Sequence, residues 1–248
     1  MLLDNQKSNT IKSNINILGG YKDFDAIPMM IGNDELQLVE RTQASKQRYI
    51  KAIEETFLSY RTSEAGLLFK QAMASSQLTM NAKLRIMSLQ FYAIDRLFQI
   101  LFDQCFLNVL NSGRAAITKH DVIAFLDEKI NNNEIEVDWS RETIDTVSRK
   151  FLTILKKLGY LEGKRKKKFK GIYNGPDFLV FYHYWLASFD ETSNVFASKF
   201  FSLLMVSEEK YLFLMKQDEI RDHLDWHYTG NRFTVEPKLT INEYANEL

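Results

Sequence analysis

The sequence predicts a mainly α-helical protein with an N-terminal helical bundle, a central winged helix-turn-helix, and a helical C-terminal region that contains a small hairpin. Three observations lead to this prediction. Apolar residues recur at helical spacing over long stretches, helix-capping residues precede most of these stretches, and alternating strand-like segments are short and few. With 248 residues, 45% of them hydrophobic, the chain can fold as one large domain or two small ones.

The N-terminal bundle is predicted over residues 1–113. After an arm of about twenty residues that is rich in Asn, Ser and Lys, Asn33 or Asp34 can cap a helix that ends near residue 57. A second, shorter helix starts at Thr62 or Ser63. Both segments carry apolar residues at helical spacing, so each is expected to bury one face.

The longest periodic stretch runs from Thr79 to Gly113 and is either one long helix or two joined helices. Apolar residues occur on most sides of its middle, which is typical of the centre of a bundle. Cys105, the single cysteine, lies in this apolar part and is expected to be buried and unreactive. One thiol excludes an intramolecular disulfide and a cysteine-based zinc or iron–sulfur site, and it favours a reducing, cytoplasmic location.

The central winged helix-turn-helix is predicted over residues 114–175. Thr118 and Asp121 have the spacing of a capping box at the start of one helix. Ser140 can cap a second helix, which Gly159 ends. Its apolar positions Ile144, Val147, Phe151, Ile154/Leu155 and Leu158 repeat at helical spacing, which leaves Arg141, Asp145, Ser148, Arg149 and Lys156 on or near the open side. Two short alternating arms around a lysine-rich tip follow, and this pattern indicates a hairpin.

The C-terminal region is predicted over residues 176–248. Its first part, residues 178–189, is strongly aromatic and is expected to be core. Residues 194–205 and 208–226 have helical patterns, whereas residues 232–241 alternate like a small hairpin around a proline. A helix pair followed by a hairpin leaves open a second winged-helix-like unit here.

The net charge of zero conceals a local asymmetry. Residues 140–175 contain eleven basic and three acidic residues, so this segment carries +8 and the rest of the chain carries −8. Clustered cations on a turn repel one another and stabilise a fold very little, whereas they displace counterions when they lie along a phosphate backbone. The segment therefore indicates double-stranded DNA as partner, with an acidic protein surface or a solvated loop as alternatives.

The candidate DNA-binding residues belong to the second helix of this module and to the basic tip. The amino-terminal part of the helix is expected to enter the major groove, and its later residues to reach the flanking backbone. Lysine against phosphate fixes position and not base identity, so the tip is expected to bind without reading sequence. The set is Ser140, Arg141, Thr143, Arg149, Lys150, Lys164, Arg165, Lys166, Lys167, Lys168 and Lys170.

The sequence offers no pattern of an enzyme or of a cofactor site. Phosphate-binding loops, dinucleotide fingerprints and nucleophile elbows are absent. His223 and His227 have i, i+4 spacing on an expected helix, but the third ligand of a metal site is not evident, so no metal is expected. The longest apolar stretches fall short of the roughly 20 residues that a membrane-spanning helix needs, and the first residues do not form a signal peptide.

Several segments together resemble the BrxA family of bacterial BREX bacteriophage-exclusion systems, over roughly residues 30–172. This resemblance implies an all-helical, non-catalytic DNA-binding protein that works with other BREX components. It places the nucleic-acid contacts on the helix 140–157 and the wing 164–170. The segments that carry the resemblance are LQLVERTQASKQR (36–48), FYAIDRLF (91–98), ITKHDV (117–122), WSRET (139–143) and LGYL (158–161).

The predicted function is sequence-tolerant binding of duplex DNA inside a multi-protein defence complex. A structural adaptor that docks other defence subunits is one alternative, and a winged-helix transcriptional regulator with a defined operator is another. An RNA-binding role has less support, because a helical bundle provides no base-stacking sheet. The sequence leaves the oligomeric state and the DNA sequence preference open.

Overall fold

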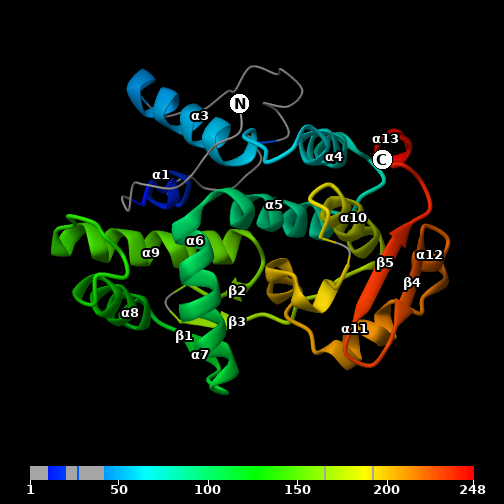
Figure 1. The fold of residues 1–248 in the computed structure, drawn as a ribbon. Helices are drawn as coiled ribbons and strands as arrows, with labels where there is room; N and C mark the ends of the chain where they lie inside the picture. Colours follow the sequence, from blue (N-terminus) through cyan, green and yellow to red (C-terminus); the bar gives the residue numbers. More distant parts are fainter. Residues whose placement is uncertain (1–10, 21–26, 28–41, 165, 192) are drawn as a thin grey trace. The chain divides into compact units, whose positions relative to one another are not determined.

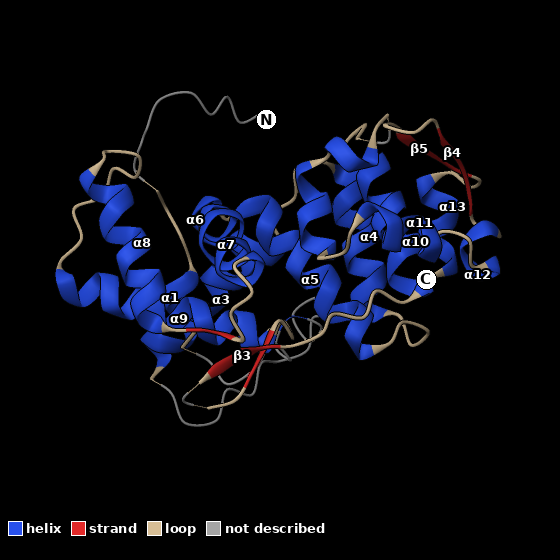
Figure 2. Cartoon of the chain, turned by 90° about the horizontal axis from the view of Figure 1, so that it is seen from below, coloured by secondary structure: helices blue, strands red, loops and turns tan. Residues whose placement is uncertain are grey.

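The computed structural model describes residues 11–20, 27, 42–164, 166–191 and 193–248. These residues form a mainly helical protein with two small antiparallel sheets (Figures 1 and 2). Contacts group the chain into two compact units. Unit 1 holds residues 1–22 and 95–170, and unit 2 holds residues 23–94 and 171–248. Each unit joins segments that are distant in sequence, while the three consecutive segments expected from the sequence remain a prediction about domains.

Unit 1 consists of helices packed around a three-stranded sheet. Its central strand, β3, pairs antiparallel with both β1 and β2, so the β2–β3 hairpin expected from the alternating arms is confirmed. The elements are α1 (Ile15–Leu18), α6 (Arg96–Ile100), the π-helical turn η1 (Leu101–Phe106), α7 (Leu107–Asn111), β1 (Ala116–Ile117), α8 (Lys119–Asn131), α9 (Arg141–Lys157), β2 (Leu161–Glu162) and β3 (Lys167–Phe169).

An aromatic stripe forms the core of unit 1. Phe98, Phe102 and Phe106 recur every four residues and are fully buried, because this spacing places them on one face of the α6–η1 helix. The Phe98 ring lies 5.8 Å from that of Phe151 on α9, and the Phe102 ring lies 5.0 Å from that of Tyr160, which directly precedes β2. The same core therefore positions both α9 and the hairpin.

The periodic stretch from Thr79 to Gly113 is two joined helices that separate at Asp95. The first helix, α5 (Met80–Ile94), belongs to unit 2, and the second, which starts with α6, belongs to unit 1. The Asp95 carboxylate accepts hydrogen bonds from the Phe98 N–H (2.9 Å), the Ser13 hydroxyl (2.8 Å) and the Asn14 N–H (3.0 Å). It thus caps α6 and holds the segment that precedes α1. Burial raises the pKa of this carboxyl to about 6.

Among the described residues, no helix combines the length and the apolar character that crossing a bilayer requires.

In unit 2 the other elements pack around α10. Residues 178–186 of this helix are buried, as expected for this aromatic segment. Besides α5, the elements are α3 (Gln43–Phe57), α4 (Ser63–Ala74), α10 (Pro176–Ala187), the 3₁₀ turns η2 (Val195–Ala197) and η3 (Lys199–Leu204), α11 (Glu208–Leu214), α12 (Asp218–Arg221), β4 (Leu224–Tyr228), β5 (Phe233–Pro237) and α13 (Ile241–Glu247).

Helix starts in unit 2 follow the cap residues. Thr62 caps α4 as expected, because its hydroxyl accepts the Ala65 N–H at 3.0 Å. Helix α3 begins later than predicted, at Gln43, with Thr42 as its N-cap. The predicted caps Asn33 and Asp34 lie outside the described residues.

The C-terminal part of unit 2 differs from the sequence prediction in two places. Residues 195–204 form short 3₁₀ turns instead of a regular helix. The helix expected over 208–226 is divided into the two short helices α11 and α12, and residues 224–228 are strand β4. Strand β4 pairs with β5, so the hairpin turns at residues 229–232 and not around Pro237. Gly230, at φ +86°, supplies the left-handed conformation of this turn.

Candidate nucleic-acid interface

Helix α9 is strongly amphipathic, and its buried face is the predicted one. Ile144, Val147, Phe151, Ile154 and Leu155 are buried against the core of unit 1. The helix starts after its N-cap Ser140 and ends before Gly159, whose φ of +84° lets the chain turn into β2. The exposed face carries Arg149 and Lys156, seven residues apart and therefore two turns along one side. Ser148, which the helical pattern had placed on or near the open side, is instead fully buried.

The amino-terminal residues of α9 have partners within unit 1. The Ser140 hydroxyl accepts the Thr143 N–H at 3.3 Å and lies 3.0 Å from the Thr143 hydroxyl. The Arg141 guanidinium is 2.5 Å from the Asp127 carboxylate of α8, although its side chain remains 67% exposed. These three residues therefore lie together at the start of α9 and remain accessible to a ligand, with the charge of Arg141 partly offset.

A second ion pair ties α8 to α9. Lys119 Nζ lies 2.5 Å from the Asp145 carboxylate, and this hydrogen bond lowers the pKa of Asp145. Together with the Arg141–Asp127 pair, it fixes the angle between the two helices at their exposed edge. Surface pairs of this kind add little stability, so their main effect is to orient the side chains of α9.

Helix α1 covers one side of α9 (Figure 1). Gly19 lies so close to α9 that an added Cβ would meet the Cβ and the carbonyl oxygen of Lys150 at 2.7 and 2.8 Å. Lys157 Nζ donates a hydrogen bond to the Leu18 carbonyl at 2.8 Å. The structure thus places Lys150, one of the candidate DNA-binding residues, beside α1 and away from the exposed Arg149 and Lys156.

The hairpin presents its lysines on two faces, because side chains alternate along a strand. Lys167 shares the inner face with Phe169, whose ring lies 5.5 Å from that of the buried Phe106. Lys168 lies on the outer face opposite Glu162, and Lys166 and Lys170 are exposed. Lys164 is exposed in the turn, which Gly163 forms at φ +91°. Arg165 lies outside the described residues.

Lys156 of α9 is close enough to Lys167 of β3 for the two charges to interact. The pKa of Lys167 is lowered, first by burial and then by the positive charge of Lys156. This proximity connects the exposed side of α9 with the hairpin. The α9–hairpin surface consists of five basic residues, Arg149, Lys156, Lys164, Lys166 and Lys167. None of them forms an ion pair with a described residue. Lys156 was missing from the predicted set, although its seven-residue spacing from Arg149 was a usable signal.

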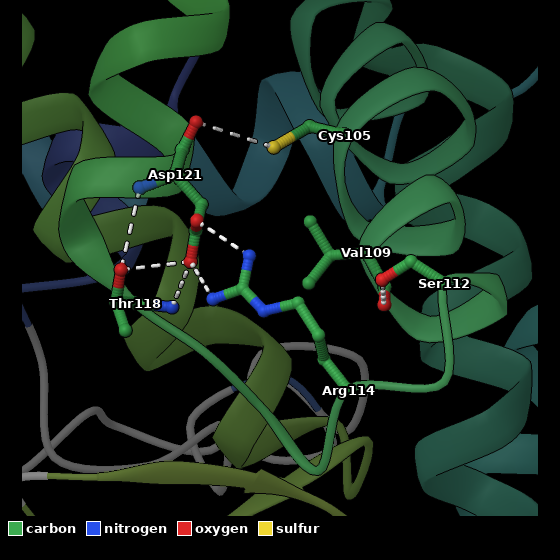
Figure 3. Close-up of polar contacts among 6 residues, drawn as sticks. All are labelled: Cys105, Val109, Ser112, Arg114, Thr118 and Asp121. Atoms are coloured by element: carbon green, nitrogen blue, oxygen red, sulfur yellow. Dashed lines mark hydrogen bonds and ion pairs between the residues drawn. The ribbon is translucent and has the colours of Figure 1, made fainter.

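The turn that leads into β1 is held by a polar cluster (Figure 3). Asp121 closes the predicted capping box with Thr118 at the start of α8, and it accepts two hydrogen bonds from the Arg114 guanidinium at 2.8 and 2.9 Å. The hydrogen bond from Arg114 is the main cause that lowers the pKa of Asp121 to about 2. Arg114 is thus paired inside unit 1.

Cys105 and the histidine pair do not form a chemical site. Cys105 is buried as expected, and burial raises the pKa of its thiol to about 12. His223 precedes β4 and His227 lies on that strand, so the expected helical i, i+4 pair is wrong. In the part of the chain that the structure describes, no group of three His, Cys, Asp or Glu side chains could hold a metal ion.

Comparison with known proteins gives one family. The model of the BrxA family matches residues 39–178, which is more than half of the chain. A search of curated proteins finds no match to the chain. The matched range extends from the residues before α3 to the start of α10, and it includes all of α9 and the hairpin.

Proposed function

Because the chain belongs to the BrxA family, and is therefore a component of a BREX defence system, we propose that it is a non-catalytic protein that binds duplex DNA through a winged helix-turn-helix in unit 1. The observation that carries this proposal is the proximity of Lys156 on α9 to Lys167 on the hairpin. It unites a helix and a hairpin tip in one basic surface.

The order of elements supports the winged helix. Strand β1, helices α8 and α9, and the β2–β3 hairpin follow one another in the chain, and the sheet has the order β1-β3-β2. In such a module the second helix of the pair enters the major groove and the hairpin acts as a wing along the backbone. In this protein α9 is the recognition helix and the segment from β2 to β3 is the wing.

The α9–hairpin surface supplies the phosphate contacts. Arg149 and Lys156 reach the backbone from α9, and Lys164, Lys166 and Lys167 reach it from the wing. Ser140, Arg141 and Thr143 lie at the end of α9 that faces the groove. Lysine and arginine on phosphates do not distinguish bases, so binding tolerates many sequences. Of the remaining predicted contacts, Lys150, Lys168 and Lys170 lie beside this surface and contribute by long-range attraction, and Arg165 is proposed to add its charge to them.

The charge distribution also favours unit 1 as the DNA-binding part. Unit 1 contains 18 basic and 12 acidic residues, whereas unit 2 contains 14 basic and 20 acidic residues. A net charge of +6 attracts a polyanion, and one of −6 repels it.

A salt series with a random duplex tests the proposal. Wild-type protein should bind with an affinity that falls steeply as salt rises. A variant with Lys164, Arg165, Lys166, Lys167 and Lys168 changed to Gln should lose both affinity and salt slope. The matched control, with the same change of charge in unit 2, is Arg48, Lys51, Lys70, Lys210 and Lys216 changed to Gln.

The outcomes separate the alternatives. Equal binding by the wing variant and the control would contradict the DNA-binding surface. Affinity that does not change with salt would contradict phosphate contacts. A preference of several orders of magnitude for one duplex over random DNA would favour a transcriptional regulator instead.

A further inference from the structure

A pocket is lined by residues of unit 2 alone, whereas the proposed DNA-binding residues belong to unit 1. It is bounded by α10, α12, α13 and the residues just before α5, and its volume is about 530 Å³. This size is in the range of known ligand pockets, about 300–1,000 Å³. Tyr173, Val180 and Tyr244 form much of its apolar lining, and Glu219 and Glu247 contribute carboxylates.

Large apolar side chains are exposed in the pocket lining and next to it in the chain. Tyr173, which lines the pocket, is 67% exposed, and Met80, which directly follows the pocket residue Thr79, is 65% exposed. Large apolar groups at this level of exposure are scarce among the described residues. Exposed apolar side chains around a pocket are typical of a surface that a partner covers.

Hydrogen bonds hold the mouth in place. The Asp177 carboxylate accepts the Thr79 hydroxyl at 2.8 Å and the Thr79 N–H at 3.3 Å. The Asn81 side-chain amide donates to the Tyr173 carbonyl at 2.9 Å. These bonds join the start of α5 to the segment that leads into α10. The pocket is therefore already formed before a ligand binds, which lowers the entropy cost of binding.

The pocket is electrostatically negative. Asp177 and Glu247 both raise the pKa of Tyr244, in addition to the larger effect of burial and that of the neighbouring Tyr184. Glu219 makes no ion pair with any described residue, and Glu247 is 3.9 Å from the His223 ring nitrogen. Residues 171–248 contain 12 acidic and six basic residues. The pocket and its surroundings are thus complementary to a cation.

We propose that this pocket binds an arginine side chain of a partner protein. The guanidinium lies against the carboxylates of Glu219 and Glu247, and the planar group and its stem lie along Tyr173 and Tyr244. Arginine fits this lining better than lysine, because guanidinium pairs with carboxylates through two parallel bonds and stacks on aromatic rings. The exposed Met80 and Tyr173 then contact apolar residues beside the arginine, which a small free amine does not supply.

A titration of the full chain with model compounds tests this assignment. Addition of N-acetyl-L-arginine methylamide should shift the amide NMR signals of residues 173–180, 219–223 and 244–247. The citrulline analogue, which has the same shape without the charge, should cause no comparable shift. N-acetyl-Leu-Arg-Leu-amide should bind several-fold more tightly than the single residue, because its leucines reach Met80 and Tyr173.

Matched variants locate the site. E219Q/E247Q should weaken binding of the tripeptide about five-fold or more, because two partly exposed charge pairs are lost. The control E208Q/E209Q changes the same charge on α11, outside the pocket, and should bind as wild type. Y173A changes an exposed side chain, so it should fold normally and still bind more weakly.

Four results would overturn the proposal. The first is that the citrulline analogue binds as tightly as the arginine compound, and the second is that the NMR shifts spread over the acidic residues of α11. The third is that the flanking leucines do not raise the affinity, and the fourth is that the chain self-associates and E219Q/E247Q abolishes this. The third would indicate a small amine as ligand, and the fourth would indicate a second copy of the chain. The DNA-binding experiment is independent of all four, because the five changes of its wing variant lie in unit 1.

Discussion

Acidification should destabilise unit 2 through one buried histidine. His183 of α10 is completely buried, and its Nε2 lies at hydrogen-bond distance, 2.5 Å, from the Tyr211 hydroxyl. Its Nδ1 has no hydrogen-bond partner among the described residues. Burial lowers the pKa of His183 to about 3, so the ring stays neutral in the folded protein.

The size of the effect follows from proton linkage. In the unfolded chain the histidine has its ordinary pKa, near 6.5, and takes up a proton that the folded state refuses until about pH 3. Stability is therefore intact above pH 6.5 and is lost as the pH falls from 6.5 towards 3. Each pH unit is worth about 1.4 kcal/mol, so two units, down to pH 4.5, cost roughly 3 kcal/mol.

Tryptophan fluorescence can report unit 2 alone. The chain has three tryptophans, and Trp139 is the one in unit 1, so a W139F background leaves Trp185 and Trp226 as probes of unit 2. Urea unfolding is then measured at pH 7.5 and at pH 4.5, in this background and with H183Q added. The difference between the two pH values should be smaller by roughly 3 kcal/mol in the His183→Gln protein, whatever the substitution costs by itself.

A matched control is His120→Gln, which removes an exposed histidine from α8 and should leave the pH dependence unchanged. An equal loss of stability on acidification with and without His183 would refute the argument. That result would mean that water or structural relaxation accommodates the charged His183 ring in the core of unit 2. A direct NMR titration of the His183 ring with a midpoint near pH 6 would refute it in the same way.

Three further predictions concern unit 1. Gly19→Ala should loosen α1 from α9 and cost about 1–3 kcal/mol, seen as faster amide exchange in α1, because the new Cβ overlaps the α9 backbone. Arg114→Gln should raise the pKa of Asp121 from about 2 towards its usual range, measurable by carboxyl NMR, while thermal stability changes little because the ion pair is at the surface. Arg149→Gln and Lys156→Gln should each lower the salt slope of DNA binding by about 1.

The local structure of unit 1 could largely be predicted from the sequence. The caps Thr118 and Ser140, the amphipathic face of α9, and the alternating arms around the basic tip each depend on neighbouring residues, and each is present. The prediction was weaker in unit 2, where Leu224 and Trp226 suit either a helix or a strand. Pairing with β5 favours the strand, and that partner is about ten residues away.

The candidate site was only partly predictable for the same reason. The basic residues can be listed from the sequence, but their three-dimensional neighbours cannot. Lys150 lies against α1, and Lys168 is on the outer face of the hairpin because of the strand register. The charge of Lys156 acts on Lys167. Each of these relations depends on residues that are distant in the chain.

What the sequence by itself determined is a group of local features, namely helices α4, α8 and α9 with their caps and the concentration of charge, because these depend on spacing within one or two turns. Only the tertiary structure decided that the long periodic stretch breaks at Asp95 and that each compact unit joins two distant segments. The physical reason is that Asp95 is held by Ser13 and Asn14, more than 80 residues away. The pattern of neighbouring residues cannot predict a contact between residues that lie so far apart in the chain.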